Sequence, residues 1–269
     1  MSIINNNFEK MTISKIKKAK NNKKLTMITA YDALFAKLFE EIADLILVGD
    51  SLNMSFAGKK DTLSATLDQM IYHTNAVCTG APKSFVILDM PFGTYINKDD
   101  ALINAIKVYA NTNAAAIKIE GGEDRADIIE HLTSNSIAVM GHIGLMPQYV
   151  RSEGGYIVRG KTPEDIEQLV ADAKAVEAAG AFSLVVEGVK TEAALAITKA
   201  VNIPVIGIGA GNVTDGQVLV WSDMLGFFED FKPKFVRRYL NGGELARQAV
   251  QQYKEDVQDA SFPDKEEEY

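Results

Sequence analysis

The sequence has almost no cysteine and few histidines, and it lacks any long hydrophobic run. Its single cysteine, Cys78, cannot form an intrachain disulfide, which is consistent with a reducing compartment. One cysteine and three scattered histidines offer no spacing typical of a zinc site. No apolar stretch reaches the roughly 18 residues that a transmembrane helix needs, and no apolar segment typical of a signal peptide opens the chain. We therefore expect a cytoplasmic protein without a membrane partner.

An excess of basic charge is also absent. The 269 residues contain 28 Lys and Arg against 36 Asp and Glu, which gives a net charge of −8. Because nucleic-acid binding relies on clustered basic side chains, this balance argues against a nucleic-acid partner. The one basic run extends from Lys15 to Lys24. RNA or membrane contact is one interpretation, but a solvated lead-in helix with Ile13 and Ile16 facing the protein body is the simpler one.

Eight short apolar runs alternate with helical patterns between Leu25 and Phe228. The first run ends at Ala30, the seventh is IPVIGIGAG and the eighth is DMLGFF (residues 223–228). The second to sixth end in ionisable residues, namely Asp50, Asp89, Glu120, His142 and Glu187. Strands that alternate with helices predict parallel βα units. Eight such units in about 250 residues predict a single α/β domain, a closed (β/α)8 TIM barrel.

We divide the chain into three parts on this basis. Residues 1–24 are a lead-in segment, residues 25–257 the barrel, and residues 258–269 an acidic tail. A long helix over residues 233–257 should close the barrel domain. The stretch between the fifth run and Thr162 has no periodicity, and its length and tyrosines favour an ordered lid. Thr162 should cap a helix over residues 163–179, with Pro163 at its first position.

Acidic residues end three consecutive predicted strands. In TIM barrels the reactive groups lie at the carboxyl ends of the strands, so Asp50, Asp89 and Glu120 should converge. Carboxylates brought together raise one another's pKa unless a cation lies between them. Few carboxylates with positions left for water or substrate suit Mg²⁺. The alternative is that these acids only cap the following helices or pair with Lys118.

Three further ionisable residues should face the same rim. Lys118 lies two residues before Glu120 and so shares its side of the strand; it could hold a substrate carboxylate, form a Schiff base or act as an ion-pair partner. His142 is either a site residue or a hydrogen-bonded core imidazole. Glu187 ends a largely apolar strand, where burial would raise its pKa and suit it to accept a proton; alternatively it caps the next helix. His73 and His131 fall in helical patterns and should be structural.

Taken together, these motifs resemble the ketopantoate hydroxymethyltransferase family. The matching strings run in order over residues 25–253, nearly the whole chain: TAYD, VGDSL, YHT, IKIEGGE, GHIGL, GGY and IPVIGIGAGNVTDGQ. The resemblance implies a Mg²⁺-dependent barrel enzyme that transfers a hydroxymethyl group from 5,10-methylenetetrahydrofolate to 3-methyl-2-oxobutanoate. The product is ketopantoate, a precursor of pantothenate and coenzyme A. Bacterial members of the family are homodecamers built from five dimers.

The resemblance also assigns roles to individual residues. It implies that Asp50 and Asp89 are direct Mg²⁺ ligands and that Glu120 completes the metal site. Ser51 and Lys118, with Asp50 and Asp89, match the positions that bind the keto acid. Glu187 matches the proton acceptor, and His142 matches an active-site histidine that orients or hydrogen-bonds. The folate site has no readable signature.

Four positions depart from the family pattern: Met146 where Thr is expected, Arg159 for Gln, Gly188 for Cys and Ser222 for His. None of them is a metal or keto-acid position.

Two other functions fit the residues less well. A Mg²⁺-dependent C–C or P–C bond enzyme of the phosphonopyruvate mutase and isocitrate lyase type would be expected to carry a cysteine loop, which is missing. A barrel without catalytic activity that serves as a binding module would not need the complete acid set.

Overall fold

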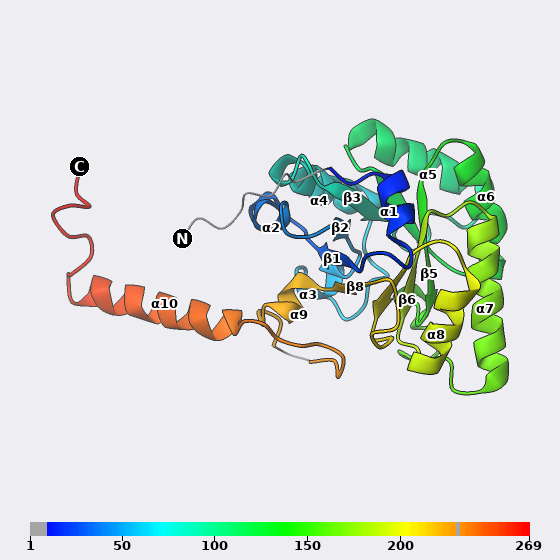
Figure 1. Ribbon diagram of the computed structural model, residues 1–269. Helices are drawn as coiled ribbons and strands as arrows, with labels where there is room; N and C mark the ends of the chain where they lie inside the picture. The colour runs from blue at the N-terminus through cyan, green and yellow to red at the C-terminus, as the bar shows by residue number, and fades with distance from the viewer. Residues whose placement is uncertain (1–9, 230–231) are drawn as a thin grey trace. The chain divides into compact units, whose positions relative to one another are not determined.

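Eight parallel strands close into a barrel in the order of the sequence, with the last strand paired to the first. The computed structural model describes residues 10–229 and 232–269 (Figure 1). The (β/α)8 fold class predicted from the sequence is confirmed. The strands are β1 (Leu25–Thr29), β2 (Leu45–Val48), β3 (Phe85–Asp89), β4 (Ala116–Glu120), β5 (Val139–Gly144), β6 (Ser183–Glu187), β7 (Val205–Ile208) and β8 (Gly216–Leu219).

The barrel interior is filled by alternate residues of each strand, as the period of two requires. The core cluster includes Leu25, Met27, Phe85, Ile87 and Val185. Asp89, Lys118 and Glu187 continue the same alternation at the carboxyl ends of their strands. The interior is therefore apolar over most of its length and becomes ionisable only at one rim.

Helices surround the strands on the outside of the barrel (Figure 1). Several begin at side-chain caps: Asp32, Thr66, Asn97 and Thr162 each accept a hydrogen bond from a backbone N–H three residues later. The elements of this part are α2 (Ala33–Phe39), α3 (Leu52–Ser55), α4 (Leu67–Gly80), α5 (Lys98–Asn111), η1 (Glu123–Arg125), α6 (Ala126–Ser134), η2 (Pro147–Tyr149), α7 (Pro163–Ala178) and α8 (Thr191–Ala200). The predicted helix after Thr162 is confirmed.

The lead-in helix α1 (Ile13–Ala19) packs on the amino-terminal end of the barrel. Ile16 is fully buried in the core cluster beside strand-opening residues such as Leu25 and Phe85, and Ile13 packs against this cluster. The predicted orientation of the helix is thus confirmed. The basic run is not solvated throughout, because Lys20 is buried in an ion pair with Asp215.

Two details at the carboxyl end of the chain were predicted wrongly. The eighth strand is Gly216–Leu219, and the apolar segment 223–228 instead comprises the end of helix α9 (Trp221–Met224) and the residues after it. The closing helix α10 is Gly242–Gln258 and does not begin at residue 233. Backbone N–H groups of Tyr239 and Gly242 bond to Met224 and Leu225 instead of to carbonyls four residues earlier, which keeps this segment out of the helix.

The chain divides into two compact units, one that ends at Leu219 and one over Val220–Tyr269. The first contains the whole barrel and every predicted site residue. Among residues 10–229 and 232–269, no helix has the length and apolar character that crossing a bilayer requires.

Candidate active site

The strand register brings the predicted site residues together at the carboxyl rim. Asp89 is paired with Lys118 across β3 and β4, and Glu120 is paired with His142 across β4 and β5. Glu187 on β6 is paired with Gly144. Because laterally paired residues in parallel strands lie side by side, four neighbouring strands supply one continuous group of ionisable side chains.

Lys118 lies at the centre of this group. Its Nζ is 2.9 Å from Asp89 Oδ1 and 3.0 Å from His142 Nδ1, and all three side chains are buried. Burial by itself lowers the pKa of Lys118, but the nearby carboxylates of Asp89, Glu120 and Asp50 outweigh it and raise the pKa above its usual value. The side chain is therefore a stable ammonium, which favours the ion-pair or substrate-binding role over a Schiff-base nucleophile.

The contacts of His142 determine its tautomer. Burial, and then the charge of Lys118, lower the pKa of His142 well below its usual value, so the imidazole is neutral. An ammonium group only donates, so Nδ1 must accept from Lys118 and the ring proton must be on Nε2. That nitrogen lies 3.3 Å from Glu187 Oε2. His142 therefore accepts a hydrogen bond from Lys118 on one side of its ring, while Nε2 faces Glu187 without completing a hydrogen bond.

Glu187 has the properties expected of a proton acceptor. Burial raises its pKa to about 7, although Lys118 acts in the opposite direction. Its side chain is nevertheless 20% exposed, so it is the accessible member of the group. It does not cap the next helix, because α8 is preceded by Lys190 and has no side-chain cap.

Asp50 and Glu120 are joined through a residue that the sequence did not indicate. Gln148, in the short turn η2 after β5, donates from Nε2 to Asp50 Oδ2 at 2.9 Å and from its backbone N–H to Glu120 Oε2 at 3.0 Å. The hydroxyl of Tyr95 donates to Gln148 Oε1 at 2.5 Å. The sequence pattern that identified the site was an apolar strand ending in an acid. Gln148 and Tyr95 lie outside the strands, so this pattern could not identify them.

Three buried carboxylates face one ammonium group, which leaves two negative charges if all of them ionise. Burial, followed by the charge of Asp89, raises the pKa of Asp50 to about 8. Burial also raises the pKa of Glu120 well above its usual value. Its Oε1 atom is buried and has no hydrogen-bond donor within the described part of the chain. Excess negative charge and an unpartnered carboxylate oxygen are the features that a divalent cation would satisfy.

The acids are not arranged as a complete ligand set. Among the described residues, no three His, Cys, Asp or Glu side chains stand close enough to hold a metal ion together. The ammonium of Lys118 and the amide of Gln148 lie against these carboxylates instead. Carboxylate oxygens are ligands that fit Mg²⁺. In this structure, however, Lys118 and Gln148 contact these oxygens.

The remaining predicted residues lie at the edges of the site. Ser51 follows Asp50, and its Oγ is 2.9 Å from the hydroxyl of Tyr31. Arg159 forms an ion pair with Glu153 within the loop after β5. Gly188 has a φ of +56°, and a Cβ there would lie 2.8 Å from Leu145 Cβ, so a larger residue would require the chain to shift. His131 lies on α6, and His73 lies on α4 with Nδ1 2.6 Å from the carbonyl oxygen of Tyr31.

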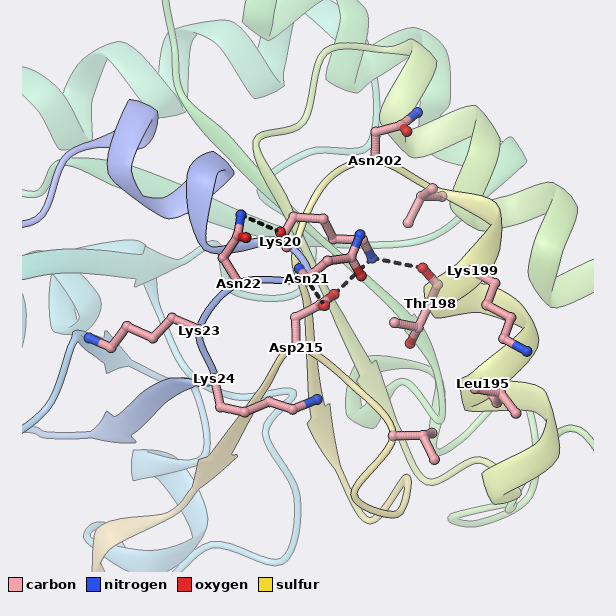
Figure 2. A pocket seen from close by; sticks show the side chains of 12 residues that line it. Lys20, Asn21, Asn22, Lys23, Lys24, Leu195, Thr198, Lys199, Asn202 and Asp215 are labelled. Carbon is pink, nitrogen blue, oxygen red and sulfur yellow. Dashed lines mark hydrogen bonds and ion pairs between the residues drawn. The ribbon is translucent and has the colours of Figure 1, made fainter.

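A cavity of about 560 Å³ lies at the opposite end of the barrel. It is lined by residues that precede strands, including Lys24 and Asp215. Figure 2 shows Lys20 reaching between Thr198 and Asp215, with Nζ 2.7 Å from the Thr198 carbonyl and 2.8 Å from the carboxylate. Lys20 is thus paired with Asp215 and the Thr198 carbonyl. The predicted site residues lie at the other end of the barrel, at the carboxyl rim.

Known proteins resemble this chain over nearly its whole length. The ketopantoate hydroxymethyltransferase family matches residues 10–265. The chain belongs to this family. It is 79% identical over 269 residues to the 3-methyl-2-oxobutanoate hydroxymethyltransferase of Aliarcobacter butzleri, which covers all of both chains. It is 65% identical to the enzyme of that name from Nitratiruptor, over 95% of this chain and 97% of the relative.

This member of the family is accordingly an enzyme of the transferase class. Among solved structures, a phosphonopyruvate hydrolase has a TM-score of 0.61, and the match covers 96% of this chain and 93% of that one. The two are 15% identical, so the likeness concerns the barrel alone. Membership of the hydroxymethyltransferase family displaces the alternative of a phosphonopyruvate mutase-type enzyme.

Proposed function

We propose that this member of the family transfers a hydroxymethyl group from 5,10-methylenetetrahydrofolate to 3-methyl-2-oxobutanoate in a Mg²⁺-dependent reaction. The observation that carries the proposal is the continuous contact from Asp89 through Lys118 and His142 to Glu187 at one rim. This arrangement places Lys118, which can bind an anion, near Glu187, which can accept a proton.

Asp50, Asp89 and Glu120 are the residues that would hold Mg²⁺. The cation would neutralise negative charge that develops on the keto oxygen when the substrate is deprotonated. The buried Glu120 Oε1, which has no hydrogen-bond donor among the described residues, supports this role. Burial and then the charge of Asp89 raise the pKa of Asp50, and a cation beside these acids would favour their ionised forms.

Lys118 would bind the carboxylate of the keto acid, with the hydroxyl of Ser51 nearby at the end of β2. An ammonium that is already buried loses little solvation when an anion joins it. It is also held in place by Asp89 and His142, so the substrate meets a positioned charge.

Glu187 would remove the proton from C3 of the keto acid. The C3–H bond breaks, the proton passes to the carboxylate, and the electron pair becomes the enolate. The enolate carbon then forms the new C–C bond with the one-carbon unit of the folate. Both C–N bonds of that unit break, one water supplies the hydroxyl oxygen, and tetrahydrofolate leaves. A carboxylate with a pKa of about 7 is half ionised at neutral pH and still basic enough to accept this proton. The Nε2–H group of His142 would orient it.

The experiment that tests this assignment is exchange of the C3 proton for solvent deuterium in the absence of folate. We expect Glu187→Gln to reduce exchange at least a hundredfold and to leave binding of the keto acid nearly unchanged. Glu192→Gln, an exposed substitution at the start of α8, is the matched control and should exchange at the parent rate. Exchange by Glu187→Gln at the parent rate would remove Glu187 from the role.

We also propose that the enzyme is a cytoplasmic homodecamer of five dimers. Helix α10 carries the exposed apolar side chains Leu245, Val250, Tyr253 and Val257, which is the pattern of a surface that meets another subunit. Sedimentation equilibrium at micromolar concentration tests the assembly, and a monomeric mass would reject it.

A further inference from the structure

Gln148 uses every hydrogen-bonding group of its side chain in the site. It is only 4% exposed and lies in the turn Pro147–Tyr149. Its Nε2 donates to Asp50 Oδ2 at 2.9 Å and to the carbonyl of Met90 at 3.0 Å, and its Oε1 accepts from Tyr95. A neutral amide is therefore fixed between the ends of two strands.

The carbonyl of Met90 determines which way this amide points. A carbonyl oxygen only accepts, so the NH₂ end of Gln148 must face Met90, and the same end faces Asp50. The oxygen end then faces Tyr95, whose hydroxyl must donate. No other orientation satisfies all three partners, so the amide hydrogens are directed at Asp50 by the surrounding protein.

One residue thereby contacts two carboxylates that come from different strands. The side chain of Gln148 holds Asp50, and its backbone N–H holds Glu120 Oε2 at 3.0 Å. Each carboxyl group thus accepts a hydrogen bond from a different part of this one residue. The distance between Asp50 and Glu120 therefore depends on the position of the turn η2, which carries Gln148.

Gln148 also separates the acids from the surface. Hollows of about 150 and 390 Å³ reach Gln148 from outside, and both are lined by Phe92 and Ser152 as well. Neither hollow is lined by Asp50 or Glu120. Gln148 is thus a residue that both lines these hollows and contacts the carboxyl groups.

We propose that Gln148 is a positioning residue that sets the affinity of the acid group for a divalent cation, by holding Asp50 and Glu120 at a fixed separation. The inference rests on the proposed Mg²⁺ site. Residues that orient metal ligands through hydrogen bonds typically contribute a factor of about 10–100 to metal affinity. Gln148 acts through Asp50 and Glu120 and needs no contact with the cation itself.

The test measures Mn²⁺ binding to the full-length protein without substrates, from the electron paramagnetic resonance signal of the free ion. We expect Gln148→Ala to weaken binding about 10–100-fold. Tyr95→Phe removes the hydroxyl that donates to Gln148 Oε1 and leaves both amide donors in place, so it should weaken binding by a smaller factor. The second change should add little to the first in the double variant, since Tyr95 acts through Gln148.

Gln168→Ala is the matched control. Gln168 also donates from an amide to carboxylates, at 2.8 Å to Glu123 and 3.2 Å to Asp172, but it is exposed on α7 and should leave Mn²⁺ binding unchanged. If Gln148→Ala does not fold, Tyr95→Phe decides the question.

The outcomes separate the two proposals. A parent protein that binds no Mn²⁺ would reject the metal site itself. A parent that binds Mn²⁺, with Gln148→Ala within twofold of it or tighter, would reject the role of Gln148 alone. If Gln148→Ala cannot be folded, a Tyr95→Phe variant that binds Mn²⁺ as tightly as the parent would also reject the role of Gln148.

Discussion

The Nε2 atom of His142 lies 3.3 Å from Oε2 of Glu187, and this contact connects the acid group to the residue best suited to accept a proton. Because Nδ1 of the same ring accepts from Lys118, the ring proton is on Nε2, which faces Glu187 without completing a hydrogen bond. Bonded contacts therefore join β3 to β5, and Glu187 on β6 lies next to them.

Exchange of the C3 proton should depend on the ionisation of Glu187. Its pKa of about 7 lies above that of an ordinary glutamate, so lowering the pH through 7 protonates it. A protonated carboxyl cannot accept a proton, and at pH 6 only about a tenth of the molecules remain active. At saturating Mg²⁺ and keto acid, the exchange rate should rise with pH and level off above pH 8. A flat profile between pH 5.5 and 8 would contradict the assignment.

Loss of the Lys118 ammonium should destabilise the protein. Lys118→Met leaves Asp89 buried without its ion-pair partner, and breaking a buried pair in this way costs about 3–5 kcal/mol of unfolding free energy. Lys107→Met is the control, because Lys107 pairs with Asp68 on the exposed surface, where such pairs contribute about 0–1 kcal/mol. Urea unfolding of both variants measures the difference, and equal stabilities would show that the buried pair is not important.

Mg²⁺ should stabilise the folded enzyme. A ligand that binds only the folded state at 100 times its dissociation constant adds about 2.7 kcal/mol, which for a protein of this size corresponds to a rise of several degrees in Tm. Thermal unfolding in EDTA and then in excess Mg²⁺ provides the measurement. Asp89→Asn, which removes one of the proposed ligands, should abolish the response; if it retains the full shift, the cation binds elsewhere.

Gly144 should be intolerant of a side chain. Its φ is +98°, and a Cβ there would lie 2.3 Å from the backbone oxygen of Glu187. Gly144→Ala should therefore cost about 1–3 kcal/mol through overpacking and should also reduce C3 exchange by moving Glu187. Gly58→Ala has a similar positive φ of +66° but open space around the new methyl group. Gly58→Ala therefore measures the cost of the backbone conformation alone. Equal losses of stability and of exchange in the two variants would argue against a role for the contact between the new Cβ and the Glu187 oxygen.

The sequence was sufficient to predict the barrel and most of its strands because they are buried on both faces. Runs such as LILV in β2 are continuous in apolar residues, which is typical of strands in a parallel sheet. Strand β8 was missed because GQVL has only two apolar residues and an exposed Gln217, while the neighbouring segment 223–228 is more apolar. Composition favoured the wrong segment, and pairing with β1 and β7 decides the strand.

The sequence by itself determined which strands end in ionisable residues and that these should share one rim, since parallel strands in a barrel all point the same way. Only the tertiary structure decided how those residues pair. Gln148 stands 98 residues from Asp50 and 28 from Glu120, and no periodic pattern relates positions so far apart. The partners of Lys118 and the tautomer of His142 likewise depend on strand register and side-chain packing. These arise when eight βα units close on one another, so they belong to the folded barrel and to no single segment of the chain.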